Sequence, residues 1–256
     1  SYTIENIAKE YESLFIWSNL FKLFELITMK ALILVGGKGT RLKPYTNTIP
    51  KPLLPVGEKP ILEIILMQLK NSGVKDVVLA VGHMSQLFES FFGDGSRLGI
   101  NINYSFEEKP VGTAGAIAYS IDLFDDDFFV MNGDLLTTLD FTAMYEYHKD
   151  NNASGTIAIH RREVKLDFGV VETGDKGLLN DYREKPSYFY DFGMGVNILK
   201  VDDVKKIIKK GEYLDMPDLM LFLKNKGNAV FTYREDCFWL DMGRPEVYDE
   251  ANKVFI

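Results

Sequence analysis

Two patterns of apolar residues alternate between residues 30 and 150. Short continuous apolar runs predict buried strands at 30–35, 76–81, 102–106 and 128–131. Apolar positions three and four residues apart predict helices at 61–70, 85–92, 113–121 and 141–149. Strands that alternate with helices are typical of an α/β fold, and we expect a doubly wound, Rossmann-like sheet of mostly parallel strands.

The pattern changes on either side of this region. The spacing of apolar residues within 1–28 predicts an N-terminal helical extension. Three roles stay open for it: packing on its own domain, a dimer contact, or the remnant of a longer upstream region. After residue 150 the alternation weakens, and we expect a mixed α+β half at 151–256 that follows the first half at 29–150. Its predicted strands are 156–160, 169–172, 181–184, 196–199, 229–233 and 238–240, and its predicted helices 201–210, 217–226 and 245–255. No hexapeptide repeat follows, so a left-handed β-helix is not expected.

Composition narrows the classes of function. The 256 residues carry 29 Lys and Arg against 37 Asp and Glu, a formal net charge of −8 that disfavours a nucleic-acid-binding surface. One cysteine excludes an internal disulfide framework and fits a cytoplasmic setting. The uncharged stretch 13–21 is too short to span a bilayer, so no membrane association is expected. The N-terminal helices and a 13% aromatic content make a homodimer plausible.

A glycine cluster follows the first predicted strand. Gly36, Gly37 and Gly39 remove Cβ atoms where the backbone turns, and free N–H groups in such a loop can cradle phosphate oxygens. Arg41 adds a delocalised cation, and Lys51 lies between two prolines that stiffen its segment. Residues 30–59 hold six basic side chains and one acid, which indicates a local site for a compact polyanion.

Several segments together resemble one family. They are LVGGKGTRL at 34–42, PKPLLPV at 50–56, KPVGTAGA at 109–116, NGD at 132–134, FG at 168–169, REKP at 183–186 and WLDMG at 239–243. In this order they resemble the sugar-1-phosphate nucleotidylyltransferases over residues 29–256, and most closely the mannose- and heptose-1-phosphate guanylyltransferases. The resemblance implies that a sugar 1-phosphate attacks the α-phosphorus of a nucleoside triphosphate and that pyrophosphate leaves, without a protein nucleophile.

The resemblance also assigns roles on the nucleotide side. Asp134 follows the strand predicted at 128–131 and Asp241 follows 238–240, and by resemblance these two carboxylates hold Mg²⁺. Arg41 and Lys51 join them as catalytic residues. The expected nucleotide-binding residues are Gly36, Gly37, Gly39, Thr40, Glu107, Gly112 and Thr113. Glu107 can accept two hydrogen bonds from guanine, which favours GTP.

On the acceptor side, the resemblance assigns sugar hydroxyls to Glu184 and the sugar phosphate to Lys185. Gly169 would let the sugar approach the backbone, and Asn197 is a further candidate for a hydroxyl contact. Glu184 and Lys185 point to the same side only if their strand bulges or ends there, and Pro186 favours an end.

Three other functions stay open. A glucose-1-phosphate thymidylyl- or uridylyltransferase shares most of these motifs. A regulatory relative without activity would keep the fold but typically lose charged residues that are present here. A guanylyltransferase acting on molybdopterin shares the glycine loop, although 183–186 and 239–241 fit a sugar phosphate better.

Overall fold

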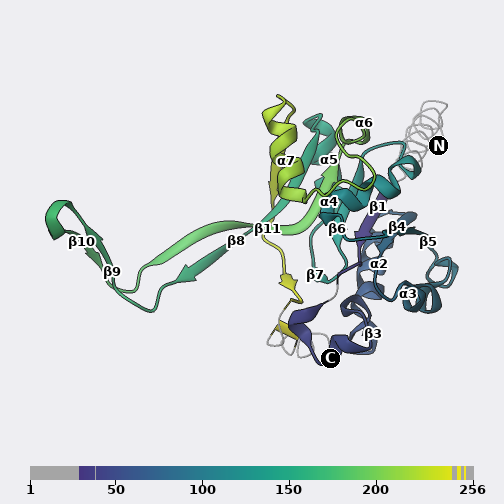
Figure 1. The fold of residues 1–256 in the computed structure, drawn as a ribbon, viewed down its shortest axis with the longest axis horizontal. Coiled ribbons are helices and arrows are strands. Elements are labelled where there is room, and N and C mark those ends of the chain that lie inside the picture. Colours follow the sequence, from purple (N-terminus) through teal and green to yellow (C-terminus); the bar gives the residue numbers. More distant parts are fainter. Residues whose placement is uncertain (1–28, 38, 244–246, 249–250, 252–256) are drawn as a thin grey trace, which may run out of the picture.

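The computed structural model describes residues 29–37, 39–243, 247–248 and 251, and its centre is one seven-stranded sheet (Figure 1). The strand order is β12-β8-β11-β6-β1-β4-β5. The strands are β1 (Lys30–Leu34), β4 (Asp76–Val81), β5 (Asn101–Phe106), β6 (Phe128–Asn132), β8 (Gly155–Lys165), β11 (Ser187–Leu199) and β12 (Val230–Arg234). Strand β11 is antiparallel to both of its neighbours, while all other pairings in the sheet are parallel. The predicted mostly parallel α/β sheet is confirmed.

Helices cover both faces of the sheet because side chains of the buried strands alternate between two cores. In β1, Ala31 and Ile33 belong to one apolar cluster and Leu32 to the other. The first cluster also contains side chains from α2 (Ile61–Asn71), α3 (Ser85–Phe92) and α5 (Phe141–Asp150). The second contains side chains from α4 (Gly112–Gly115), the 3₁₀ helix η5 (Ala116–Tyr119), α6 (Val201–Val204) and α7 (Met216–Asn225). This is the layering of a doubly wound fold.

Two predicted helices are shorter than expected. The predicted helix 113–121 divides into α4 and η5, and the carbonyl of Leu214 accepts hydrogen bonds from the first-turn amides of Ala114 and Gly115 at 3.0 and 2.9 Å. The predicted helix 201–210 ends at Val204, where four lysines follow within six residues and repel one another. The predicted helical extension 1–28 and most of the helix predicted at 245–255 lie outside the described residues.

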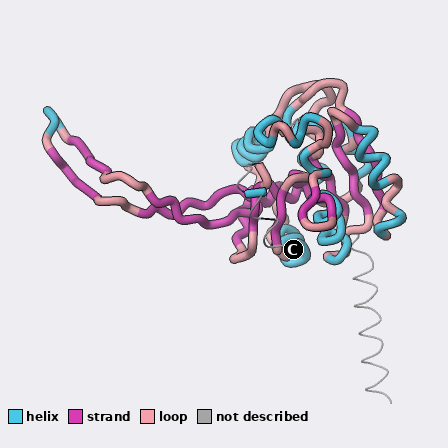
Figure 2. Tube along the Cα trace, turned by 90° about the horizontal axis from the view of Figure 1, so that it is seen from below, coloured by secondary structure: helices cyan, strands magenta, loops and turns pink. Residues whose placement is uncertain are grey.

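Strands β8 and β11 continue far beyond the sheet and form the base of an arm, residues 161–192 (Figures 1 and 2). Beyond them the arm carries a hairpin of β9 (Val170–Thr173) and β10 (Leu179–Arg183). The strands predicted at 156–160 and 196–199 are therefore too short. Four of the five residues at 161–165 are charged, so no buried face marks the continuation of β8.

Two small sheets lie beside the central one. Strand β7 (Leu135–Thr137) pairs with β13 (Trp239–Asp241), and β2 (Pro55–Val56) pairs with β3 (Lys59–Pro60). The first pairing brings the C-terminal part of the chain to the end of β6. None of the helices in the described part of the chain is long and apolar enough to cross a membrane.

Candidate active site

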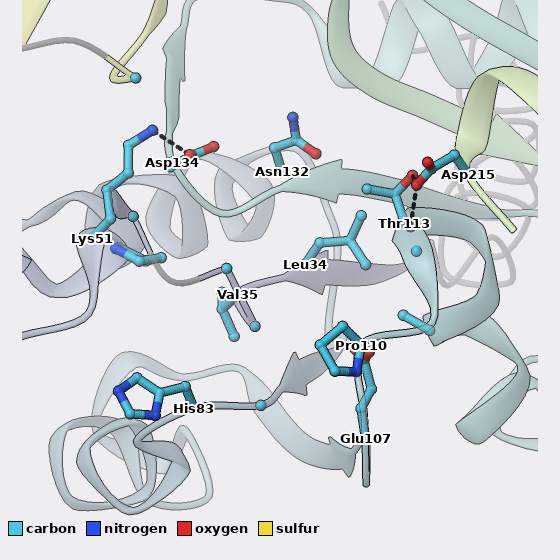
Figure 3. A pocket seen from close by; sticks show the side chains of 18 of the residues that line it. Leu34, Val35, Lys51, His83, Glu107, Pro110, Thr113, Asn132, Asp134 and Asp215 are labelled. Carbon is cyan, nitrogen blue, oxygen red and sulfur yellow. Dashed lines mark hydrogen bonds and ion pairs between the residues drawn. The ribbon is translucent and has the colours of Figure 1, made fainter. Parts of the chain in front are cut away.

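A cavity of about 780 Å³ opens at the carboxyl ends of the parallel strands (Figure 3). Strands β4 and β6 flank β1 on opposite sides, so the chain reverses its winding direction there, which is where open α/β sheets bind ligands. The lining residues are Leu34, Val35, Gly36, Gly37, Gly39, Arg41, Leu42, Lys51, Pro52, Gly82, His83, Glu107, Glu108, Lys109, Pro110, Gly112, Thr113, Ala116, Asn132, Asp134, Asp215 and Gly243. Its volume suits a nucleotide-sized ligand.

The glycine loop after β1 forms one wall of the cavity. Gly39 has φ +58°, and a Cβ there would lie 2.9 Å from Thr46 Cγ2 and 3.2 Å from Lys51 Cβ, so the turn requires glycine. By contrast, a Cβ on Gly37 would meet no atom within 4 Å. Gly37 is therefore open to the cavity, and a ligand can approach its backbone closely. Lys38 and the side chain of Thr40 lie outside what the structure describes.

Lys51 joins two carboxylates at this end of the cavity. Its side chain is buried, with 6% of the residue exposed, and its ammonium donates a hydrogen bond to the Asp134 carboxylate (Figure 3). The same ammonium lies 3.8 Å from Asp241 Oδ1. Asp134 and Asp241, which are far apart in sequence, therefore face the same space, as their predicted shared role requires.

Pairing of β7 with β13 explains why the two aspartates meet. Asp241 lies opposite Leu135, the residue after Asp134, and the Met242 amide donates to the Asp134 carbonyl at 3.1 Å. Gly243 keeps the neighbouring space free, because a Cβ there would lie 3.1 Å from Asp241 Oδ1 and 3.4 Å from Arg41 Nη1. Arg41 thus belongs to the same group of charges.

The donor set at this end fits Mg²⁺. Asp134, in the turn between β6 and β7, and Asp241, at the end of β13, reach one lysine ammonium, and the Asp241 side chain is 58% exposed, which leaves room for water or phosphate oxygens. Mg²⁺ is usually held in this way, by one or two carboxylates together with substrate phosphates. Within the described residues, no group of three or more His, Cys, Asp or Glu side chains is arranged as an all-protein cage.

Glu107 lies at the other end of the cavity, beyond Leu34 and Val35 (Figure 3). Burial raises the pKa of the Glu107 carboxyl, although a hydrogen bond from the Val111 amide, 3.4 Å from Oε2, partly opposes the rise. Its Oε1 lies 3.5 Å from where a Cβ of Gly36 would stand, so the carboxylate faces the glycine loop. A half-buried acceptor here can read a flat, hydrogen-bonding ligand.

Thr113 and Asp215 form a third side of the cavity, and Asp215 was not predicted. Asp215 Oδ1 accepts from the Thr113 amide at 3.1 Å, and Thr113 Oγ1 accepts from the Met216 amide at 2.8 Å. A hydrogen bond from the Tyr213 hydroxyl and the bond from Thr113 lower the pKa of Asp215. A sequence signal existed, because Asp215 precedes a Met-Pro pair that starts a predicted helix. Asn132, another lining residue, stood unassigned inside the NGD segment.

The predicted acceptor residues are divided between the sheet and the arm. Asn197 is buried in β11 opposite Val130 and does not line the cavity. Gly169 and Glu184 lie together on the arm, since a Cβ on Gly169 would stand 3.1 Å from Glu184 Oε2. Strand β10 ends at Arg183 and Lys185 has φ +44°, so the expected end of the strand before Pro186 is confirmed. None of these three arm residues lines the cavity of its own chain.

Comparison with known proteins identifies the family. A family model described as nucleotidyl transferase matches residues 30–255. The chain belongs to the nucleotidyl transferase family. The mannose-1-phosphate guanylyltransferase catalytic subunit beta of Danio rerio is 36% identical over 225 residues, covering 85% of this chain and 62% of the relative. A UTP–glucose-1-phosphate uridylyltransferase of Synechocystis is 34% identical over 241 residues, covering 87% and 62%.

A solved structure shares the fold of this chain. HddC from Yersinia pseudotuberculosis, in complex with GMP-PN, superposes with a TM-score of 0.69 at 23% identity, over 89% of this chain and 100% of HddC. The chain spans about 62% of the length of both curated relatives described above. The family match agrees with the predicted resemblance over residues 29–256.

Proposed function

We propose that this nucleotidyl transferase moves a nucleotidyl group from a nucleoside triphosphate to a sugar 1-phosphate and releases pyrophosphate. The observation that carries the proposal is the convergence of Lys51, Asp134 and Asp241 at one end of a nucleotide-sized cavity whose other end holds Glu107. Charges of both signs at one end suit a triphosphate with its metal ion, and the half-buried acceptor at the other suits a base.

The reaction asks the protein for positioning and charge neutralisation. Arg41 and Lys51 face the space where the phosphates would lie against the open backbone of Gly37, so they would offset negative charge as the α-phosphorus is attacked. Asp134 and Asp241 would hold Mg²⁺, which supplies Lewis-acid polarisation of the phosphoryl oxygens when bound. Lys51 keeps these carboxylates neutralised and aligned before the metal and nucleotide arrive.

GTP is the triphosphate that the site favours. The Glu107 carboxylate can accept hydrogen bonds from both N1–H and the 2-amino group of guanine, whereas uracil and thymine offer one ring N–H. The Danio rerio relative is named for guanylyl transfer and the Synechocystis relative for uridylyl transfer, so UTP is the competing donor. A mannose- or heptose-type sugar 1-phosphate is the acceptor that we propose, with Gly169, Glu184 and Lys185 as its contacts and Asn197 as a further candidate.

A substrate matrix tests the proposal. The 256-residue protein is incubated with Mg²⁺, each of GTP, UTP, dTTP and ATP, and each of mannose, heptose and glucose 1-phosphate, while pyrophosphate release is followed. We expect the highest kcat/KM with GTP and a mannose- or heptose-type acceptor. A preference for UTP or dTTP with glucose 1-phosphate would replace the substrate assignment, and no release with any pair would contradict the activity and favour a regulatory relative.

A further inference from the structure

The arm leaves the acceptor residues remote from the cavity that they are expected to serve. Six register positions separate the Gly193–Ile159 pair at the sheet from the Ser187–Lys165 pair, and Lys185 lies two residues beyond. At about 3.3 Å per residue, Glu184 and Lys185 stand on the order of 25 Å out along the arm. The arm extends outward from the sheet in both views (Figures 1 and 2).

Contacts at its base hold the arm in this direction. The Arg162 guanidinium lies 4.2 Å from the centre of the Trp239 ring, and its Nη2 donates to the Trp239 carbonyl at 2.8 Å. Trp239 Nε1 in turn donates to the Met194 carbonyl at 3.0 Å. The Arg162 contacts tie the β8 strand of the arm to β13, and the Trp239–Met194 bond holds β13 against β11 just inside the base of the arm. Folding the arm over its own cavity would therefore break the Arg162 contacts.

The arm exposes apolar side chains on an unusual scale. It holds nine of the seventeen large hydrophobic residues that are exposed in the described part of the chain: Leu166, Phe168, Val171, Leu178, Leu179, Tyr182, Phe189, Tyr190 and Phe192. The rings of Tyr188, Tyr190 and Phe192 form a row on one face, with successive centroids 6.4 Å apart. An exposed patch of this kind marks an interaction surface, and so do the unpaired edges of a long two-stranded ribbon.

A second copy of this chain is the occupant that fits. At roughly 200 Å² for a fully exposed large side chain, the nine residues expose about 1,000 Å² per chain, so two arms supply about the area of a stable protein interface. The arm carries six basic and seven acidic side chains, which give it a net charge of −1. Electrostatic repulsion between this nearly neutral arm and a second chain of net charge −8 is therefore small. Each copy also has one arm and one cavity. In a two-fold dimer, each arm can therefore contact the cavity of the other copy at the same time.

We infer that the arm, residues 161–192, packs on a second copy of this chain and delivers Glu184 and Lys185 to the partner's cavity. The homodimer is then required for a complete acceptor site, because each cavity combines the nucleotide side of one copy with the arm of the other. The delivery of acceptor contacts rests on the proposed function, whereas the exchange of arms does not.

The oligomeric state gives the first test. Light scattering of the 256-residue protein should give twice the 29.1 kDa of one chain. The double variant Tyr190→Ser with Phe192→Ser should weaken the dimer about 100-fold or more, as expected for two aromatic anchors. The matched control, Phe91→Ser with Phe222→Ser, removes similarly exposed rings from α3 and α7 and should leave the mass unchanged. A monomeric wild type, or equal effects of both double variants, would overturn the inference.

Cross-linking tests the arm's destination without using activity. Lys185 on the arm and Lys109 at the rim of the cavity are both exposed, so an amine-reactive reagent can join them. In dimers assembled from ¹⁴N- and ¹⁵N-labelled chains, the exchange predicts mixed-isotope peptides that link Lys185 to Lys109. If Lys185–Lys109 links occur only in peptides of a single isotope, the arm lies on its own cavity. If no Lys185–Lys109 link forms, the arm lies near neither cavity. Either result contradicts the inference.

Complementation connects the exchange to the proposed function. A chain with Lys51→Ala has a defective nucleotide side and an intact arm, while a chain with Lys185→Ala has the reverse. The two are co-expressed with different tags, purified through both, and assayed at a sugar 1-phosphate concentration far below the KM of the Lys185→Ala variant, where a site without Lys185 turns over slowly. One of the two sites in each heterodimer is complete, so roughly half of the wild-type turnover should return. If both sites stay inactive in a stable heterodimer, the arm does not act in the partner. An inactive wild type contradicts the proposed function alone, since mass and cross-links still report the exchange.

Discussion

The cavity and the arm are built in opposite ways from the same sheet. The cavity is formed where buried parallel strands end, and its charged groups are held by neighbours on several elements, as Lys51 is by Asp134 and Asp241. The arm is formed where two strands leave the core, and most of its large apolar side chains are exposed. The first arrangement suits chemistry that needs fixed positions, and the second suits contact with another molecule. The predictions below set one region against the other.

The largest effect is expected at the charged end of the cavity. Asp134→Asn removes a proposed metal ligand and the main partner of Lys51, so turnover should fall about 1,000-fold or more. Pyrophosphate release under saturating substrates measures it, and circular dichroism checks the fold. Asp122→Asn, a change to a carboxylate whose side chain is 97% exposed, serves as control and should leave turnover unchanged. Comparable turnover of the Asp134 variant and wild type would remove Asp134 from the mechanism.

Core and arm should differ sharply in stability. Phe129 is fully buried against Phe141 and Tyr145, and Phe129→Ala should lower the free energy of unfolding by about 3–5 kcal/mol. Phe189→Ala on the arm, where 59% of the residue is exposed, should change it by about 0.5 kcal/mol or less for the monomer. Urea titrations at several protein concentrations measure both. A loss at Phe189 that grows with concentration would report the dimer, whereas a large loss independent of concentration would show that the arm belongs to the core.

A smaller effect is expected from the acceptor contacts. Lys185→Ala should raise the KM for sugar 1-phosphate about 10- to 100-fold, because the proposed charge-assisted hydrogen bond to the phosphate would be lost, and leave the KM for GTP unchanged. Lys165→Ala removes another exposed lysine of the arm and is the matched control. Steady-state kinetics with each substrate varied in turn separates the two constants. If both KM values rise together, Lys185 acts on the whole site and not on the acceptor.

The smallest expected effect is the pH dependence of GTP binding through the Glu107 carboxylate. Burial raises the pKa of Glu107 above the 4.5 of an ordinary glutamate, so its carboxylate takes up a proton at a higher pH. In the proposed contact the ionised form accepts both guanine hydrogens, so the Kd for GTP should increase as pH falls through that raised pKa. Glu107→Gln should weaken GTP about tenfold at neutral pH and abolish this acid dependence. Calorimetry between pH 4.5 and 7.5 checks both, and an unchanged acid dependence in the variant would assign it to another group.

Local patterns were sufficient for the elements whose burial is regular. Strand β4 and helix α3 have the predicted bounds because β4 is one continuous apolar run after Asp76 and the apolar residues of α3 keep helical spacing from end to end. The glycine loop and the NGD segment were recognisable as well, since each follows a buried strand directly. Asp215 escaped prediction because its contact with Thr113 joins segments about a hundred residues apart. The Met-Pro pair after Asp215 marks a helix start, but it does not indicate that the carboxylate reaches Thr113.

The sequence by itself determined the doubly wound sheet, the family and the identity of the charged residues, because periodic burial and short motifs are written in neighbouring positions. Only the tertiary structure decided which of those residues share a cavity. Pairing of β7 with β13 brings Asp241 to Asp134, and the long β8–β11 ribbon carries Glu184 and Lys185 away from both. The physical reason is that strand pairing and strand direction depend on hydrogen bonds between distant segments, whose partners a single run of residues does not name.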